Sequence, residues 1–228
     1  MVWYTIFCLA ALAVAGNLYQ LVSLGRERRA YPMPGRLIDV GGYRMHLYCV
    51  GDSGPAVVLD SGLEDSFAEW KKVQAEASTF VRVCSYDRAG MGYSDRSLQA
   101  RNSATFAREL HKLLHTASIS LPYILVGHSM AALDIRLYAS FYPEDVAGLV
   151  FVDGSHPDQL ERFPPALHAM NAGWIRKGRL WQFVTPLGLA RLLGYCEDDP
   201  EVRAVECLII MHEKALMNAA PFGRALRS

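Results

Sequence analysis

The sequence lacks an excess of charge of either sign. Its 228 residues include 23 basic and 23 acidic side chains, and 51% of the residues are hydrophobic. A disordered chain combines low hydrophobicity with high net charge, so that class is excluded. A protein that captures nucleic acid electrostatically needs a basic excess, so no nucleic-acid partner is expected. The length suits one domain with an appendage.

The sequence also lacks a cysteine pattern. Its five cysteines lie at positions 8, 49, 84, 196 and 207, with no C-x-x-C pair and no spacing typical of a zinc site. An odd, scattered set predicts ordinary buried thiols rather than a disulfide framework. We therefore expect no structural metal and no cofactor.

Charged side chains are absent from the first 25 residues. Residues 2–24 are mostly aliphatic or aromatic, and as a helix they would extend about 34 Å, close to the hydrocarbon thickness of a bilayer. Trp3, Tyr4 and Tyr19 lie towards the two ends, where interfacial aromatic residues are favoured. Arg26, Arg28 and Arg29 follow this segment. We expect residues 1–25 to form a membrane anchor, which would make this a single-pass membrane protein.

A cleaved signal peptide is the alternative for this segment. Ala13-Val14-Ala15 has the A-x-A form that precedes a cleavage site, and cleavage would leave a secreted or periplasmic protein. Against cleavage, the first residues contain no Lys or Arg, and apolar residues continue beyond Ala15. The basic residues that follow favour a cytoplasmic position for the rest of the chain, but one short cluster leaves the orientation open.

Apolar runs and amphipathic stretches alternate beyond a Pro- and Gly-rich linker at 31–35. The runs expected to form strands are 36–40, 43–50, 56–60, 81–86, 123–126 and 146–152. The stretches expected to form helices are 66–78, 103–116 and 130–142. In the first helix, Phe67, Trp70, Val73 and Ala77 are expected to share the apolar face. This alternation predicts an α/β fold with a mostly parallel sheet and crossover helices.

A serine lies between an apolar strand and a helix in Gly127-His128-Ser129-Met130-Ala131. In a G-x-S-x-G nucleophile elbow, a tight turn holds the serine in a strained backbone geometry, and small neighbours let strand and helix approach. The turn directs the helix N-terminus and its free N–H groups at the reacting oxygen. Ser129 is the expected nucleophile, with Ala131 where a second glycine is typical.

Three further loops accompany this serine in a fixed order. They are Asp60-Ser61-Gly62-Leu63, Asp87-Arg88-Ala89-Gly90-Met91-Gly92-Tyr93-Ser94 and Val152-Asp153-Gly154-Ser155-His156-Pro157. With the elbow, they make residues 36–160 resemble the serine-nucleophile, cap-containing branch of the α/β-hydrolase superfamily. The resemblance implies that the Leu63 and Met130 N–H groups are oxyanion donors. Asp87 and Arg88 are expected to be a hydrogen-bonded loop scaffold.

The acid and base that a serine nucleophile needs are missing from their usual places. In this fold they follow the serine in the order Asp or Glu, then His. About 75 residues follow Asp153, and their patterns favour helices, although 207–211 could form a strand followed by Glu213 as the acid. We therefore expect a helical cap at 154–228 and a core, 26–153, that is incomplete at its C-terminus. Substitutes are Asp153 as acid and either His156 or His212 as base.

These features lead to two functional expectations. The first is a hydrolase that uses Ser129 on an ester-like bond of a small-molecule substrate. An apolar substrate is suggested by the apolar residues Trp174, Trp181, Phe183 and Leu187. A serine at this position disfavours the epoxide and haloalkane branches of the family, which use a carboxylate. The alternative is a truncated, catalytically inactive, membrane-tethered protein of the same fold.

Overall fold

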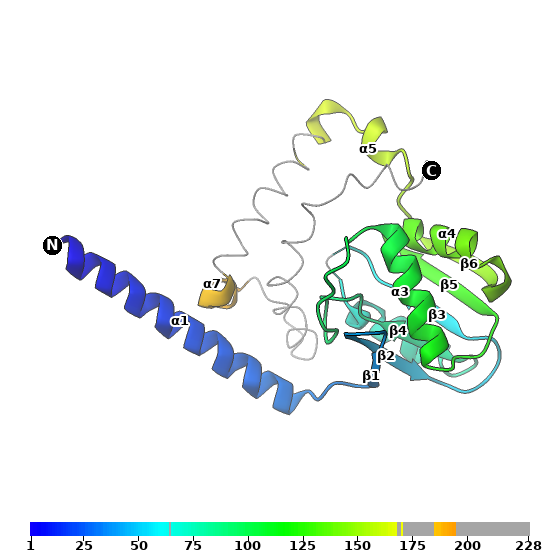
Figure 1. Cartoon of the computed structure of the whole chain (residues 1–228), viewed down its shortest axis with the longest axis horizontal. Coiled ribbons are helices and arrows are strands. Elements are labelled where there is room, and N and C mark those ends of the chain that lie inside the picture. Colours follow the sequence, from blue (N-terminus) through cyan, green and yellow to red (C-terminus); the bar gives the residue numbers. More distant parts are fainter. Residues whose placement is uncertain (64, 168–169, 171–184, 195–228) are drawn as a thin grey trace.

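The computed structural model describes residues 1–63, 65–167, 170 and 185–194 (Figure 1). A six-stranded sheet forms its centre, in the order β1-β2-β4-β3-β5-β6. The strands are β1 (Arg36–Asp39), β2 (Arg44–Val50), β3 (Val57–Asp60), β4 (Val83–Tyr86), β5 (Tyr123–His128) and β6 (Val146–Val152). Strand β2 pairs antiparallel with β1 and β4, and β4, β3, β5 and β6 run parallel. The expected α/β fold is confirmed.

Helices cover both faces of the sheet. They are η1 (Phe67–Trp70), α2 (Lys71–Ala77), α3 (Ser103–Thr116), α4 (Ala131–Phe141) and η2 (Pro143–Asp145). Successive strand residues point to opposite faces. Val58 packs in the larger core cluster with α3 and α4, whereas Leu59 packs in a second cluster with Trp70. Helices α3 and α4 therefore lie on one face, and η1 with α2 on the other.

The helix predicted at 66–78 buries a different side chain from the one expected. Val73, expected on the apolar face, is 50% exposed, and its neighbour Gln74 is 2% exposed instead. The Gln74 amide donates to the carbonyls of Tyr48 and Val83, at 3.0 and 3.2 Å, and accepts from the Ser85 hydroxyl at 2.6 Å. The helix turns a glutamine inward because these hydrogen bonds satisfy its buried amide.

The prediction that the cysteines are free thiols is wrong for two of them. Cys49 on β2 and Cys84 on β4 are directly paired in the antiparallel register and form a disulfide. A sequence separation of 35 residues hides this pairing from local spacing rules, because the strand register alone makes the two residues neighbours. Cys8 is an exposed free thiol, and the cysteines at 196 and 207 lie outside the described residues.

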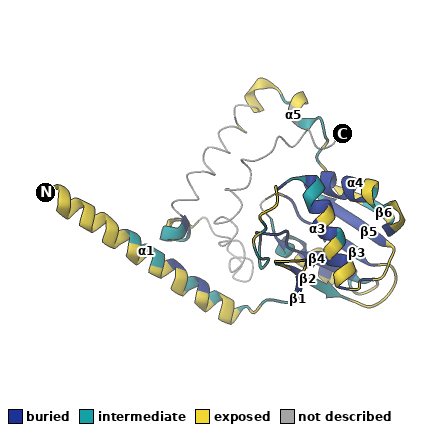
Figure 2. Cartoon of the chain, viewed as in Figure 1, coloured by how far each residue is buried: buried dark blue, intermediate teal, exposed yellow. Residues whose placement is uncertain are grey.

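The N-terminal helix α1 (Val2–Ala30) is long and apolar enough to cross a membrane: its most apolar stretch has a mean hydropathy of 1.7, and 6% of that stretch is buried. Most of α1 is exposed (Figure 2). A signal sequence near the N-terminus meets the same criteria. The second half of α1 contacts η3 (Thr185–Leu187) and α7 (Leu189–Leu192). The Asn17 amide donates to the Pro186 carbonyl at 3.1 Å, and Arg191 pairs with Glu27. These contacts all lie after Ala15, so they fit either a retained or a cleaved N-terminus.

Strand β6 is the edge of the sheet within the described part of the chain. Its last three residues, Val150, Phe151 and Val152, are each at least 40% exposed. Apolar side chains at the carboxyl end of an edge strand indicate a surface that a further element of the fold would normally cover. The predicted cap at 154–228 is described only in part, by the short helices α5 (Gln159–Arg162), η3 and α7.

Candidate active site

Ser129 lies at a sharp junction between strand and helix. Strand β5 ends at His128 and α4 begins at Ala131, which leaves two residues for the turn. Ser129 has a φ of +51°, a left-handed conformation that is costly for a residue other than glycine. Its N–H donates to the Val152 carbonyl at 3.1 Å, and its carbonyl accepts from the Ser155 N–H at 2.8 Å. These bonds to the end of β6 and the loop beyond it hold the strained turn in place.

The small residues of the motif allow strand and helix to approach. A Cβ added at Gly127 would lie 2.8 Å from the backbone of Ala131, so no larger residue fits there without displacement. Ala131 is completely buried, so its methyl group fits where a glycine is typical. The substitution that departs from the motif is therefore accommodated, and the first glycine is the essential one.

A cavity of about 400 Å³ opens beside Ser129. Its described lining also includes Asp153, Gly154, Ser155, His156, Gln159, Arg162 and Phe163. Asp153 has a φ of +45°, a second strained position on the same rim. Most of these residues are polar, and the predicted apolar residues at 174, 181 and 183 lie outside the described residues. Leu187 instead packs against α1, with its carbonyl close to Gly16.

Two backbone N–H groups, those of Leu63 and Met130, lack a protein acceptor within the described part of the chain. The Met130 N–H belongs to the residue that caps α4, where the first turn leaves N–H groups unpaired. They are the two groups that the family resemblance implies as oxyanion donors, and that role stays a prediction.

Arg88 fixes the orientation of the loop that carries Leu63. Its guanidinium donates to the Ser61 carbonyl at 2.6 Å and to the Gly62 carbonyl. In a trans peptide, the C=O and the following N–H point in opposite directions. A Gly62 carbonyl held by Arg88 therefore directs the Leu63 N–H away from the guanidinium. Arg88 is 4% exposed, so this arrangement is set within the core.

Two buried carboxylates neutralise Arg88. Asp60, at the end of β3, accepts from the guanidinium at 2.9 Å, and Asp134, in the first turn of α4, lies 3.9 Å from it. Burial raises the pKa of Asp60 to about 7, although Arg88 opposes this shift. Burial likewise raises the pKa of Asp134 to about 6. One arginine thus joins the Leu63 loop to the helix that begins after Met130.

Glu69 connects the Leu63 loop to the residue that precedes Ser129. Its carboxylate accepts from the Gly62 N–H at 2.9 Å and contacts Nδ1 of the His128 ring. The His128 ring also packs edge-on against Trp70 at 6.4 Å. The printed contacts of the His128 ring are therefore with Glu69 and Trp70, on the η1 side of the sheet.

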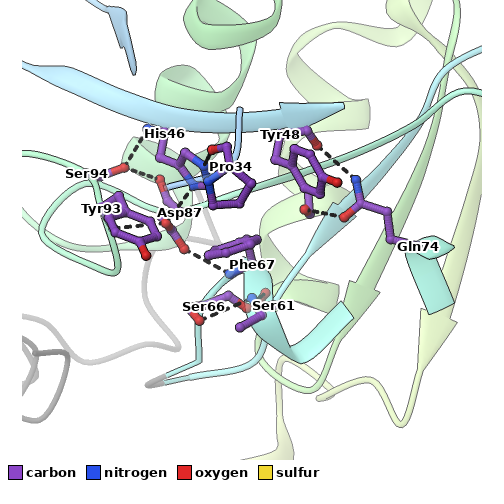
Figure 3. Close-up of polar contacts among 12 residues, drawn as sticks. Pro34, His46, Tyr48, Ser61, Ser66, Phe67, Gln74, Asp87, Tyr93 and Ser94 are labelled. Atoms are coloured by element: carbon purple, nitrogen blue, oxygen red, sulfur yellow. Dashed lines mark hydrogen bonds and ion pairs between the residues drawn. The ribbon is translucent and has the colours of Figure 1, made fainter. Parts of the chain in front are cut away.

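The loop after β4 is a hydrogen-bonded scaffold, as predicted (Figure 3). The Asp87 carboxylate accepts from the N–H groups of Phe67 and Tyr93 at 2.8 and 3.0 Å and pairs with His46 at 2.8 Å. Gly92 has a φ of +49°, and a Cβ there would lie 2.3 Å from this carboxylate. Asp87 therefore connects η1, β2 and its own loop, which together support the Leu63 loop.

The predicted acid and base are less well organised. Asp153 and His156 line the Ser129 cavity, whereas His212 lies outside the described residues. His156 Nδ1 accepts from the Asp158 N–H at 3.1 Å, which places the proton of a neutral ring on Nε2. The Asp158 carboxylate lies 3.8 Å from the same Nδ1. Both His156 and Asp153 are exposed, so no buried network orients them.

Comparison with known proteins identifies the class to which this arrangement belongs. The model of the alpha/beta hydrolase fold family matches residues 55–190, which is more than half of the chain. The chain belongs to the α/β-hydrolase family. This agrees with the resemblance inferred from the elbow and its accompanying loops.

The matching relatives and structures are longer than this chain. The uncharacterized protein YbdG of Bacillus subtilis is 25% identical over 193 residues, covering 84% of this chain and 58% of YbdG. YqjL of the same organism is 34% identical over 103 residues, covering 45% of this chain and 41% of YqjL. The chain thus spans about half the length of these relatives.

Two solved structures share the fold. The carboxylesterase CesB from Bacillus subtilis superposes with a TM-score of 0.61 at 16% identity, covering 92% of this chain and 73% of CesB. Est816, an N-acyl homoserine lactone degrading enzyme, gives a TM-score of 0.60 at 16% identity, covering 82% of this chain and 73% of Est816. At this identity, the likeness shows the fold alone.

Proposed function

We propose that the chain acts as a serine hydrolase on an ester-like bond of a small molecule. The observation that carries this proposal is the strained turn at Ser129, which opens into a cavity of about 400 Å³. Backbone strain is retained where the surrounding structure enforces it, and such positions cluster at reactive sites. A serine in this place, rather than a carboxylate, supports attack on a carbonyl carbon.

In this mechanism Ser129 Oγ attacks the carbonyl carbon of the bound substrate and forms a tetrahedral intermediate. The Leu63 and Met130 N–H groups stabilise its oxyanion, and the N-terminus of the 11-residue helix α4 adds a positive potential. Because Arg88 and the capping turn fix these donors, little reorganisation is needed as charge develops. Loss of one such donor typically costs about 10²–10³ in rate.

Proton transfer is assigned to the residues that share the Ser129 cavity. We propose His156 as the base, after its ring turns away from the Asp158 N–H, and Asp153 as the carboxylate that stabilises the charged ring. His212 is the other predicted base and is tested alongside His156.

We propose that α1 anchors the protein in a membrane, with the folded core in an oxidising compartment. The exposed leucines at 189, 192 and 193 lie in the segment that contacts α1 and would add apolar surface beside it. The Cys49–Cys84 disulfide supports the compartment, because disulfides persist outside the reducing cytosol. Alkaline extraction of membranes and mass measurement of the mature N-terminus distinguish an anchor from a cleaved signal peptide.

Hydrolysis of a series of p-nitrophenyl esters tests the proposed activity. The full chain in detergent is compared with Ser129→Ala and with Ser155→Ala, which alters a second serine of the same cavity. We expect Ser129→Ala to lower kcat by about 10⁴-fold or more, since residues of a nucleophile–base unit fail together. Ser155→Ala retains most of the activity, because only its backbone N–H contacts Ser129. Absence of turnover in a folded protein supports the alternative, an inactive member of the family.

A further inference from the structure

Two histidines and an aspartate lie close together at the end of the sheet where the parallel strands begin. Ser129 lies at the opposite end, where these strands finish. His111 and His115 are four residues apart on α3 and therefore share one face of the helix. Asp145 ends η2 and directly precedes β6. Ser129 and Asp153 follow the carboxyl ends of β5 and β6, so this cluster lies at the amino ends of the parallel strands and is separate from the proposed active site.

The three side chains converge on one point. Asp145 Oδ2 lies 3.0 Å from His115 Nε2 and 3.5 Å from His111 Nε2. All three potential ligand atoms lie within 4.8 Å of one another. Two atoms that each lie about 2.0–2.1 Å from a tetrahedral zinc ion are about 3.3 Å apart. The two distances from Asp145 Oδ2 to the imidazole nitrogens, 3.0 and 3.5 Å, are close to this value.

Hydrogen bonding alone does not account for this convergence. A carboxylate oxygen offers about two lone-pair sites. Oδ2 of Asp145 accepts from the Tyr138 hydroxyl at 3.0 Å and is also 3.0 Å from His115 Nε2. His111 Nε2 is directed at the same oxygen from 3.5 Å, beyond the usual range of an N–H···O bond. A cation between the two rings and the carboxylate would use all three groups.

Neighbouring rings hold the ligands in place. The His111 ring stacks on Tyr142 at 3.7 Å with an interplanar angle of 17°, and His115 packs on its other side at 4.1 Å. Tyr138 is fully buried and orients the carboxylate through its hydroxyl. Such supporting contacts fix the direction of metal ligands and raise affinity. The His115 side chain is 43% exposed, which gives an ion access and leaves room for a water ligand.

We propose that His111, His115 and Asp145 bind one divalent transition-metal ion, with Zn²⁺ as the best match to two imidazole nitrogens and one carboxylate oxygen. The ion would join α3 to the connection between α4 and β6. An ion bound there would stabilise the packing of α3 against this connection. The signal in the sequence is a His-x-x-x-His spacing on a helix, which a search based on cysteine spacing does not detect.

Zinc titration of the full chain, purified in detergent without a polyhistidine tag and after chelator treatment, tests this proposal. We expect saturable binding of one ion by calorimetry. At a zinc concentration one hundred times Kd, the midpoint of thermal unfolding should rise by about 5–10 °C. His115→Gln should weaken binding by roughly 10–100-fold or more and abolish the shift.

Lys112→Gln is the matched control, since Lys112 is exposed on the same helix between the two histidines. It should bind zinc as the unaltered chain does. Asp145→Asn provides a second test if His115→Gln lowers the unfolding midpoint without metal. Equal zinc binding by the unaltered chain and both ligand variants would overturn the assignment, as would the absence of saturable binding to the unaltered chain.

Discussion

The two halves of the candidate site differ in how firmly the fold holds them. Ser129 and the Leu63 loop are supported from beneath by Arg88, Asp60 and Asp134, all buried. Asp153 and His156 lie on the exposed rim, and the contacts of His156 are with residues two or three positions away. In the proposed mechanism, the buried core therefore holds the attacking residue and one oxyanion donor, whereas the residues proposed to move the proton lie on the exposed rim.

Apart from Ser129→Ala, the largest expected effect concerns the exposed half of the site, Asp153 and His156. Replacing His156 by Gln should lower kcat for ester hydrolysis by about 10²–10⁴-fold, because the base of a serine nucleophile would be removed. The parallel variant His212→Gln should retain activity. Full activity of His156→Gln together with loss of activity in His212→Gln would assign the base to the segment beyond residue 194.

Variants of Arg88 test the other half of the site, which consists of Ser129 and the Leu63 loop. Arg88→Met should lower kcat by about 10²–10³-fold with little change in KM, because the Leu63 N–H would lose its fixed direction. Arg88→Lys keeps the charge but not the fork that reaches two carbonyls, so it should recover only part of the activity. Activity is measured on samples whose unfolding midpoints are known. A folded Arg88→Met variant with unchanged kcat would remove Arg88 from the account.

The Cys49–Cys84 disulfide, which joins β2 to β4, should contribute to the stability of the folded core. Replacement of Cys49 and Cys84 by Ala should lower the free energy of unfolding by about 2–4 kcal/mol, since the bond closes a 35-residue segment. Denaturant unfolding with and without a reductant measures this. A reductant that lowers stability in the unaltered chain should have no effect on the double variant. Equal stability of the two proteins under oxidising conditions would show that the bond does not form.

The buried carboxyls predict a smaller, pH-dependent effect. Because burial raises the pKa values of Asp60 and Asp134 above the usual 3.8, their protonated forms favour the folded state. Their contribution is complete below about pH 3.8 and is lost as the pH rises through 6 to 7. The Asp134→Asn variant lacks this carboxyl group, so nothing at position 134 titrates in this pH range. Its stability relative to the unaltered chain should therefore increase between pH 4 and pH 7, as measured by urea unfolding. A constant difference would contradict the raised pKa.

Features that depend on residues close together in the chain were predictable from the sequence, whereas features that depend on distant residues were not. The bounds predicted for α3 and β6, 103–116 and 146–152, match the structure because amphipathic spacing and apolar runs determine them locally. The turn at Ser129 was predictable because Gly127, Ser129 and Ala131 lie within five consecutive residues. Contacts between distant segments were not predictable. The Cys49–Cys84 bond and the Arg88 fork depend on strand order, and the inward Gln74 depends on acceptors on two other strands.

The reactivity of Ser129 tests the central claim most directly. The full chain is treated with a fluorophosphonate, and the modified peptide is mapped by mass spectrometry. If the turn presents an activated hydroxyl to the cavity, one phosphonyl group is attached to Ser129 and none to Ser155. A folded protein that remains unmodified at Ser129, or that is modified equally at other serines, would contradict the account.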